Sequence, residues 1–191
     1  MQIILASTSP FRKSILEKLG IAFNTVSPNV DESALDNEQP EELVKRLAIA
    51  KAQAVAKNHS SSLVIGSDQV AVIDNKILGK PGDHENAIKQ LRNASGKRVT
   101  FHTGLALINT DSGNIQSEVV PYHVVFRKLS DELIDGYLKA EQPYNCAGSF
   151  KSEALGIILF ERLEGDDPNT LVGLPLIRLS RMLEKEGIKL I

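Results

Sequence analysis

Asp68 is the residue of this sequence that most strongly indicates chemistry. It directly follows Leu-Val-Ile-Gly-Ser, an apolar run that predicts a buried strand. We therefore expect Asp68 at the carboxyl end of that strand, where ligands bind in open α/β sheets. A carboxylate there can hold a divalent metal ion or act as a general base toward a water molecule. The alternative is an aspartate that forms a turn by capping its own backbone, and position alone leaves both interpretations open.

The N-terminal stretch forms a second candidate site, one for phosphate. Apolar residues 3–6 predict a short buried strand, and a hydroxyl-rich turn that begins at Ser7 follows it. Ser9 suits the N-cap of a helix, Pro10 suits its first position, and Gly20 is placed to end it. A strand that runs into a helix N-terminus presents free N–H groups and a positive dipole end, which attract phosphate. An ordinary capped βα unit explains the same pattern.

Several basic residues are candidates for binding a polyphosphate. Arg12 stands at the helix N-terminus just described, and Lys80 lies in a short loop with glycine before it and proline after it. Lys51 falls near the apolar face of a helix predicted over about 41–58. The alternative for each lysine is a solvated surface charge. The full set of cationic candidates is Arg12, Lys13, Lys51, Lys80, Arg98 and Lys151.

Two adjacent carboxylates follow the next predicted strand, at Asp31 and Glu32. They can supply oxygen ligands to Mg²⁺ or Mn²⁺, or they can form a plain acidic loop. His102 and His123 fall inside predicted strands without a ligand pattern nearby, so we interpret both as structural. Cys146 is the only cysteine, which rules out an internal disulfide and makes a cysteine-ligated zinc site a poor interpretation.

Composition limits the class of function. The chain has 191 residues and a formal net charge of −2, and no block of Lys and Arg stands out, which argues against nucleic acid as a partner. No apolar run is long enough to cross a bilayer, and the N-terminus lacks a signal-peptide pattern, so we expect a cytoplasmic protein without a membrane partner. Neither a P-loop nor a dinucleotide-binding fingerprint is present.

Helices and strands alternate along the chain. This order predicts an α/β fold, a single domain over 1–191 with a central mixed, largely twisted sheet flanked by helices and an active cleft at the strand ends. The expected strands cover 22–27, 63–73 with an interruption at Asp68–Gln69, 98–109, 115–127 and 157–163. The expected helices, besides the first, cover 41–58, 84–94, 131–141 and a closing helix from Leu174–Pro175 to about Glu186.

Motifs spread over nearly the whole chain together resemble the Maf family, in that family's order. The resemblance implies a nucleoside triphosphate pyrophosphatase that releases pyrophosphate and a nucleoside monophosphate with a divalent metal ion (Mg, Mn or Co). One departure is Ala154, where the family pattern has glycine after Ser-Glu, and it bears only on the local backbone. The motifs are 5–12 (LASTSPFR), 30–32 (VDE), 50–52 (AKA), 66–70 (GSDQV), 78–81 (LGKP), 101–104 (FHTG), 147–153 (AGSFKSE) and 165–175 (GDDPNTLVGLP).

Within that family, Ser-Asp-Gln at 67–69 together with Phe11 and Glu153 resembles the 7-methyl-GTP pyrophosphatase branch. The resemblance implies that Asp68 is the proton acceptor and that Phe11, Gln69 and Glu153 determine specificity. The chemistry agrees, because a carboxylate can accept from guanine N1–H and N2–H₂. An aromatic face attracts a base that N7-methylation has made cationic, and the Gln69 amide can adapt to a remaining base edge.

Another interpretation of Phe11 is a core residue, since it shares a helix face with Ile15 and Leu19. The function likewise has alternatives: a broader nucleotide pyrophosphatase, or a nucleotide-binding regulator of cell division and septum formation.

We expect the triphosphate to lie across the strand–helix entry from Ser7 to Arg12, clamped by Arg12, Lys51 and Lys80. Glu32 or Asp68 would hold the metal ion. The resemblance also implies a homodimer.

Overall fold

The computed structural model describes all residues, Met1–Ile191. Its seven strands follow the order β2-β1-β3-β5-β6-β7, with β4 paired to β3. β1 is parallel to β2 and β3, whereas the β3–β4 and β6–β7 pairs are antiparallel, so the predicted α/β fold with a mixed sheet is confirmed. The strands are β1 (Gln2–Leu5), β2 (Asn24–Thr25), β3 (Ser62–Ile73), β4 (Lys76–Leu78), β5 (Arg98–Asn109), β6 (Ile115–Phe126) and β7 (Phe160–Glu164).

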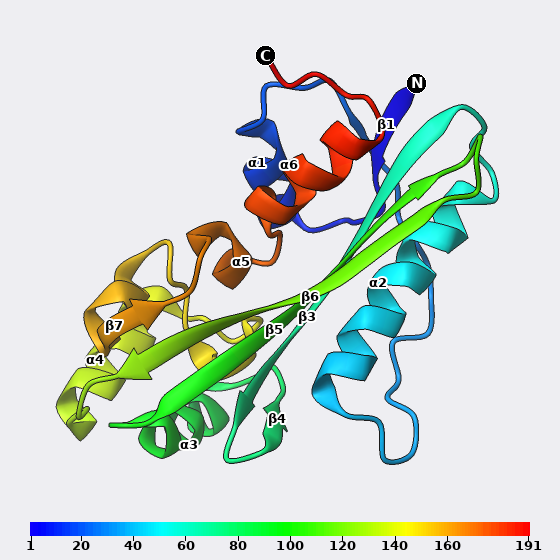
Figure 1. Ribbon diagram of the computed structural model, residues 1–191. Helices are drawn as coiled ribbons and strands as arrows, with labels where there is room; N and C mark the ends of the chain where they lie inside the picture. Colours follow the sequence, from blue (N-terminus) through cyan, green and yellow to red (C-terminus); the bar gives the residue numbers. More distant parts are fainter. The chain divides into compact units, whose positions relative to one another are not determined.

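Six α-helices and two short 3₁₀ helices complete the fold (Figure 1). The chain groups into two compact units, which are described separately: the first comprises 1–69, 102–120 and 167–191, and the second 70–101 and 121–166. A single domain over 1–191 stays a prediction. The helices are α1 (Pro10–Glu17), α2 (Pro40–Ala56), α3 (His84–Ala94), α4 (Asp131–Glu141), α5 (Pro168–Val172), α6 (Leu176–Lys185), η1 (Ala147–Ser149) and η2 (Leu155–Leu159).

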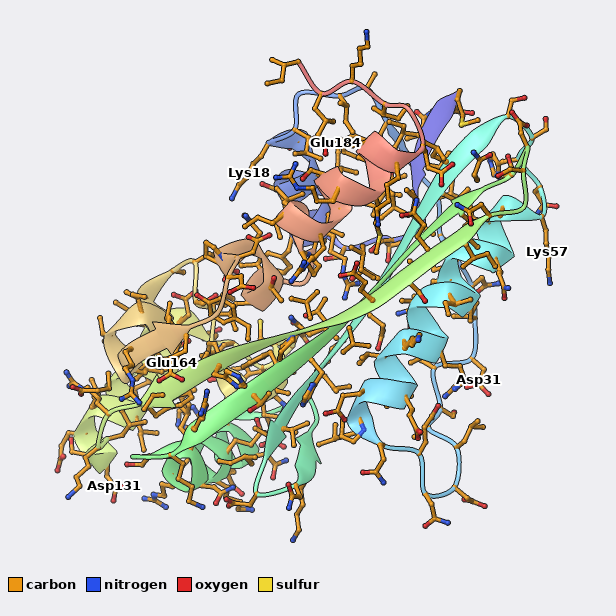
Figure 2. All side chains as sticks on the ribbon, in the orientation of Figure 1. Lys18, Asp31, Lys57, Asp131, Glu164 and Glu184 are labelled. Carbon is orange, nitrogen blue, oxygen red and sulfur yellow. The ribbon has the colours of Figure 1, made fainter.

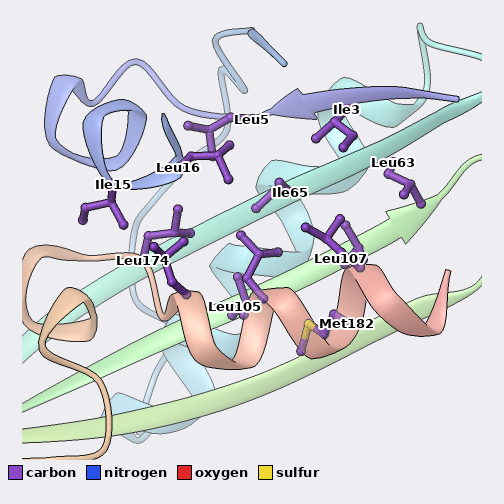
Figure 3. Packing of buried hydrophobic residues seen from close by; sticks show 13 residues of the cluster. Ile3, Leu5, Ile15, Leu16, Leu63, Ile65, Leu105, Leu107, Leu174 and Met182 are labelled. Atoms are coloured by element: carbon purple, nitrogen blue, oxygen red, sulfur yellow. The ribbon is translucent and has the colours of Figure 1, made fainter. Parts of the chain in front are cut away.

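The core of the first unit has two layers, one on each face of its strands. Alternate residues of a strand point to opposite faces, so Ile3 and Leu5 pack with α1 and α6, whereas Ile4 and Ala6 pack with α2. Figure 1 shows α2 along one face of these strands and α1 and α6 over the other. Figure 3 shows how Leu105 and Leu107 of β5 fill the layer beneath α6.

Glycines let α2 approach the sheet closely. A Cβ atom added at Gly66 of β3 would lie 2.1 Å from the carbonyl oxygen of Ala48, and one at Gly104 of β5 would lie 2.0 Å from that of Val44. Any side chain at these two positions would force the helix away. The contact buries one face of α2, and that face includes Lys51. Lys57, just beyond the helix, instead projects into solvent (Figure 2).

The second unit also follows from local signals. Asp83 caps α3 and Ser130 caps α4 through side-chain oxygens that accept backbone N–H bonds, as the sequence predicts. Asp74 and Asn75 have positive φ values of 48° and 61° and form the two-residue turn between β3 and β4. The core of this unit contains a cluster of aromatic rings in which Phe150 packs edge-on against Phe101, Phe126 and Phe160.

Several predicted elements are wrong at their boundaries. The strand expected over 22–27 is only two residues long, and the apolar stretch at 157–163 begins as η2 before it joins β7. A short apolar run does not distinguish strand from helix by periodicity, which explains the second error. The loop expected at 165–170 contains the start of α5.

None of the helices combines the length and the apolar character that crossing a membrane requires.

Candidate active site

The first unit brings Asp68, Lys51 and Glu32 together. The Lys51 ammonium lies 2.6 Å from Asp68 Oδ1 and 2.7 Å from Glu32 Oε1. The side chains of Lys51 and Asp68 are only 7% and 10% exposed, whereas that of Glu32 is 60% exposed. A buried charge pair flanked by one solvent-facing carboxylate therefore forms the centre of the site. The alternative of a solvated surface charge is wrong for Lys51, whereas a metal-ligand role for Glu32 stays a prediction.

The strand position predicted for Asp68 needs correction. β3 does not break at Asp68–Gln69 but continues without interruption to Ile73. Its parallel pairing with β1 nevertheless ends at Leu5 and Ile65, and Asp68 comes three residues later. Asp68 therefore lies just beyond the carboxyl end of β1 and not at the end of β3. Strand β3 continues past its parallel pairing with β1 and then pairs with β4. Since Asp68 lies inside a strand, it is not a turn-capping aspartate.

Arg12 enters the same cluster from the start of α1. Ser9 caps this helix by accepting from the Arg12 N–H, and Pro10 holds its first position, as predicted. The Arg12 Nε donates to the carbonyl oxygen of Gly173 at 2.9 Å. Burial lowers the pKa of the guanidinium, and the negative charges of Asp68 and Glu32 oppose that shift. Arg12 therefore lies close enough to Asp68 and Glu32 for its charge to interact with both carboxylates.

Ser7 also lies in the first unit and is 6% exposed. Its Oγ accepts from the Ser9 N–H at 3.1 Å, which holds the turn between β1 and α1. A hydroxyl that accepts in this way can still donate its own hydrogen. Ser7 is therefore able to donate to a phosphate oxygen, the role expected of it.

Three residues without a role predicted from the sequence, Gly173, Thr103 and Thr170, orient the site residues Arg12 and Gln69. Gly173, after α5, accepts from Arg12 Nε and from Ser67 Oγ, both at 2.9 Å. Gln69 Nε2 donates to Thr103 Oγ1 at 2.8 Å and to the carbonyl oxygen of Thr170 at 2.7 Å. Two of the acceptors are main-chain carbonyls, which any residue type carries. The signals in the sequence are the 101–104 and 165–175 motifs, which contain these residues but indicate no role for them.

The three remaining site predictions concern exposed side chains. Phe11 is 43% exposed while Ile15 of the same helix is 4% exposed, so the interpretation of Phe11 as a core residue is wrong. Lys80 and Glu153 both belong to the second unit and are exposed. Ser152 Oγ donates to Glu153 at 3.3 Å. That Lys80 and Glu153 act together with the first-unit residues stays a prediction.

The backbone at Ala154 agrees with the departure from the family pattern. Its φ is −130°, well outside the left-handed region that favours glycine, so alanine is accommodated there.

The other candidates have local partners. Lys151 pairs with Glu141 at 2.9 Å and Arg98 with Glu164 at 2.7 Å, both within the second unit. His102 lies 3.5 Å from Glu41, and His123 Nδ1 lies 3.0 Å from Thr100 Oγ1. Burial raises the pKa of the Cys146 thiol, which disfavours the thiolate that a nucleophile would need.

The carboxylates suit a divalent cation that arrives with phosphate. No group of three or more His, Cys, Asp or Glu side chains is placed to hold a metal ion. Mg²⁺ is commonly bound by one or two carboxylates together with substrate phosphates and water. Glu32 and Asp68 supply that number of carboxylates, so the residues present fit such an ion only with phosphate oxygens completing its shell.

Comparisons with known proteins agree over nearly the whole chain. A family model described as Maf-like protein matches residues 2–186. A 7-methyl-GTP pyrophosphatase of Pseudoalteromonas translucida (strain TAC 125) is 58% identical over 186 residues, which cover 97% of this chain and 92% of that protein.

Two solved structures show a weaker likeness. A HAM1 protein from Coxiella burnetii has a TM-score of 0.49 and 15% identity, covering 80% of this chain and 88% of that chain. The Staphylococcus aureus Ham1 protein has a TM-score of 0.45 and 19% identity, covering 69% and 73%. At these scores, neither structure bears on the function of this chain.

Proposed function

The chain belongs to the Maf-like protein family, and from this premise we propose that it hydrolyses 7-methyl-GTP to 7-methyl-GMP and diphosphate. The 58% identity to a protein of that named activity supports the proposal. The observation that carries the chemistry is the buried Asp68 carboxylate, which Lys51 holds in place at 2.6 Å in a cluster with Glu32 and Arg12. This arrangement provides a proton acceptor beside cations that attract phosphate.

In the proposed reaction, a water molecule attacks the α-phosphorus of the nucleotide while Asp68 accepts one of its protons. The bond between the α-phosphorus and the α–β bridging oxygen breaks, and the bridging oxygen leaves with diphosphate. Arg12, Lys51 and Lys80 bind the phosphate oxygens, and Ser7 donates a hydrogen bond to one of them. Positioning and charge neutralisation account for most of the acceleration in such a reaction.

Glu32 and Asp68 would hold a divalent cation, Mg²⁺, Mn²⁺ or Co²⁺, in company with the substrate phosphates. When bound, the ion would neutralise negative charge on the phosphates. Lys51, which both carboxylates share, would also attract the substrate phosphates to the same place.

The base is proposed to be recognised by Phe11, Gln69 and Glu153. Phe11 is exposed and free to stack on the cationic 7-methylguanine ring, an attraction worth on the order of 0.5–2 kcal/mol. Glu153 would accept hydrogen bonds from N1–H and N2–H₂ of the base. We further propose that the enzyme acts in the cytoplasm as a homodimer that removes modified nucleotides from the pool.

The test is diphosphate release by the purified protein from the common NTPs and dNTPs and from 7-methyl-GTP, with each of the three metal ions. We expect a strong preference for 7-methyl-GTP. Asp68→Asn keeps the shape of the side chain but removes the base, so turnover should fall by about 10²–10⁴-fold. Asp74→Asn, at an exposed aspartate of the β3–β4 turn, is the matched control and should stay near wild type.

Two further variants separate the substrate assignment from the chemistry. Phe11→Ala and Glu153→Gln should weaken 7-methyl-GTP hydrolysis selectively, whereas equal losses on all nucleotides would favour a broader pyrophosphatase. Tight nucleotide binding with no diphosphate released under any metal ion would point instead to a nucleotide-binding regulator. Near wild-type turnover in Asp68→Asn would remove Asp68 from the role of base.

A further inference from the structure

The amide of Gln69 is fixed in one orientation by its surroundings. Gln69 Nε2 lies 2.7 Å from the carbonyl oxygen of Thr170 and 2.8 Å from Thr103 Oγ1. A carbonyl oxygen only accepts hydrogen bonds, so the nitrogen end of the amide, not its oxygen end, must face Thr170. The reverse orientation would bring two acceptor oxygens together, with only the Thr103 hydroxyl hydrogen available to both.

Thr103 also fixes the orientation of the Gln69 amide. Its side chain is fully buried, and its hydroxyl lies 3.2 Å from the same Thr170 carbonyl, to which it donates. A hydroxyl has one hydrogen and two lone pairs. Once that hydrogen is committed to Thr170, Thr103 can only accept from Gln69. Both hydrogens of the Gln69 amide are therefore in use, one on each partner.

The consequence for a ligand is that Gln69 offers only an acceptor. Its Oε1 is the one atom of the amide with hydrogen-bonding capacity to spare, and the side chain is half-buried, not enclosed. An amide that could rotate would serve donor and acceptor edges alike. A fixed Oε1 instead favours bases that present N–H donors and disfavours those that present lone pairs at the same place.

Guanine carries three such hydrogens, one at N1 and two at N2, so Glu153 can accept two of them and leave one N2 hydrogen for Gln69, whereas adenine presents a lone pair at N1. The positive charge that N7-methylation places on the ring strengthens these donors. An acceptor-only Gln69 therefore matches 7-methylguanine better than it matches unmethylated guanine or adenine.

We propose that Thr103 is a specificity-determining residue, because its hydroxyl and the Thr170 carbonyl hold Gln69 as a dedicated hydrogen-bond acceptor for the base. This inference rests on the proposed function and extends it to a residue that does not itself touch the nucleotide. Thr103 is a positioning residue: it acts on selectivity through Gln69 and leaves the phosphate chemistry of Asp68 and Arg12 unaltered.

The test is Thr103→Val, which keeps the shape of the side chain and removes the hydroxyl. The Gln69 amide then keeps only the Thr170 carbonyl as a partner, so it is held less firmly and its second hydrogen is free to donate to the base. We expect the ratio of kcat/KM for 7-methyl-GTP over GTP to fall by roughly threefold to tenfold, the value of one net hydrogen bond. The loss should appear in KM and leave kcat nearly unchanged. Thr103→Ser, which restores a hydroxyl, should recover the wild-type ratio.

Two controls separate positioning from general damage. Thr100→Val makes the same substitution elsewhere on β5, where the hydroxyl contacts His123, and should leave the ratio unchanged. In a Gln69→Ala background, Thr103→Val should have no further effect on selectivity, because the side chain that it positions is gone. A second loss of the same size in that background would overturn the inference.

Equilibrium binding of 7-methyl-GMP and GMP to each variant keeps this test independent of turnover. If the wild type turns over no nucleotide but still prefers 7-methyl-GMP, the proposed function fails. A fall of that binding preference in Thr103→Val would still support the positioning of Gln69 by Thr103. If Thr103→Val folds with the wild-type melting temperature and keeps the wild-type preference in both assays, the inference that Thr103 positions Gln69 is wrong and the proposed function stands. No preference in the wild type overturns both.

Discussion

Replacing Lys51 with methionine tests whether the Lys51–Asp68 pair is the centre of the site. Methionine keeps most of the length of the side chain and its place on the buried face of α2, but it carries no charge. The Asp68 carboxylate would then lose its counter-ion at 2.6 Å while staying buried. Glu32 would lose the same partner, but its side chain is 60% exposed and water can take over. The penalty therefore falls on Asp68.

The size of the effect follows from burial and distance. At an effective dielectric constant of about 20, the gross attraction between two unit charges at the observed separation is about 6 kcal/mol. Desolvation of the lysine offsets part of this, and removing one partner of a buried pair typically costs about 3–5 kcal/mol. The exposed Glu32 contact adds less than about 1 kcal/mol. For a chain of this length the expected fall in melting temperature is roughly 6–20 °C.

The assay is urea and thermal unfolding of Lys51→Met beside Lys45→Met. Lys45 lies on the same helix and is exposed, so its variant makes the same change in net charge without touching a buried carboxylate. We expect Lys45→Met to cost no more than about 0.5 kcal/mol.

A double-mutant cycle then isolates the pair. If the two charges support each other, Asp68→Asn should cost less in the Lys51→Met background than in the wild type. Equal costs for Lys51→Met and Lys45→Met, or additive costs in the cycle, would refute the idea that the pair is coupled and buried.

Two further predictions concern the segment that ends α5. Gly173 has a φ of 111°, and a Cβ there would lie 3.3 Å from Arg12 Nε, so Gly173→Ala should raise KM for all nucleotides alike. Gly187→Ala, with a φ of 80° and open space around it, adds backbone strain alone and should leave KM unchanged in the same kinetic assay. Thr170 Oγ1 is buried without a hydrogen-bond partner, so Thr170→Val should raise the free energy of unfolding by about 1 kcal/mol in urea. A destabilised Thr170→Val would mean that this hydroxyl has a partner.

The sequence by itself determines those features that arise from contacts between residues close together in the chain. Ser9 and Pro10 start α1, and Asp83 and Ser130 start α3 and α4, because an N-cap is a contact between residues three apart or fewer. The alternating apolar residues of β1 likewise fix which side chains enter each layer of the core. The same local logic identified the hydroxyl-rich turn after β1 and the acidic pair that contains Glu32.

The tertiary structure alone decides how those parts form a site. The sequence predicts Lys51 near an apolar helix face, but only the close approach of α2 at Gly66 and Gly104 brings its ammonium onto Asp68. The register of β1 against β3, which the sequence does not reveal, also places Asp68 beyond the carboxyl end of β1.

The acceptors that orient Arg12 and Gln69 are the furthest from any sequence signal. They are main-chain carbonyls at Gly173 and Thr170, 161 and 101 residues away along the chain. Every residue carries a carbonyl oxygen, so residue type cannot reveal which one is used. The sequence thus determined which side chains are able to do chemistry, and the fold decided which of them are buried, paired and held in a single orientation, because those properties arise from contacts between distant segments.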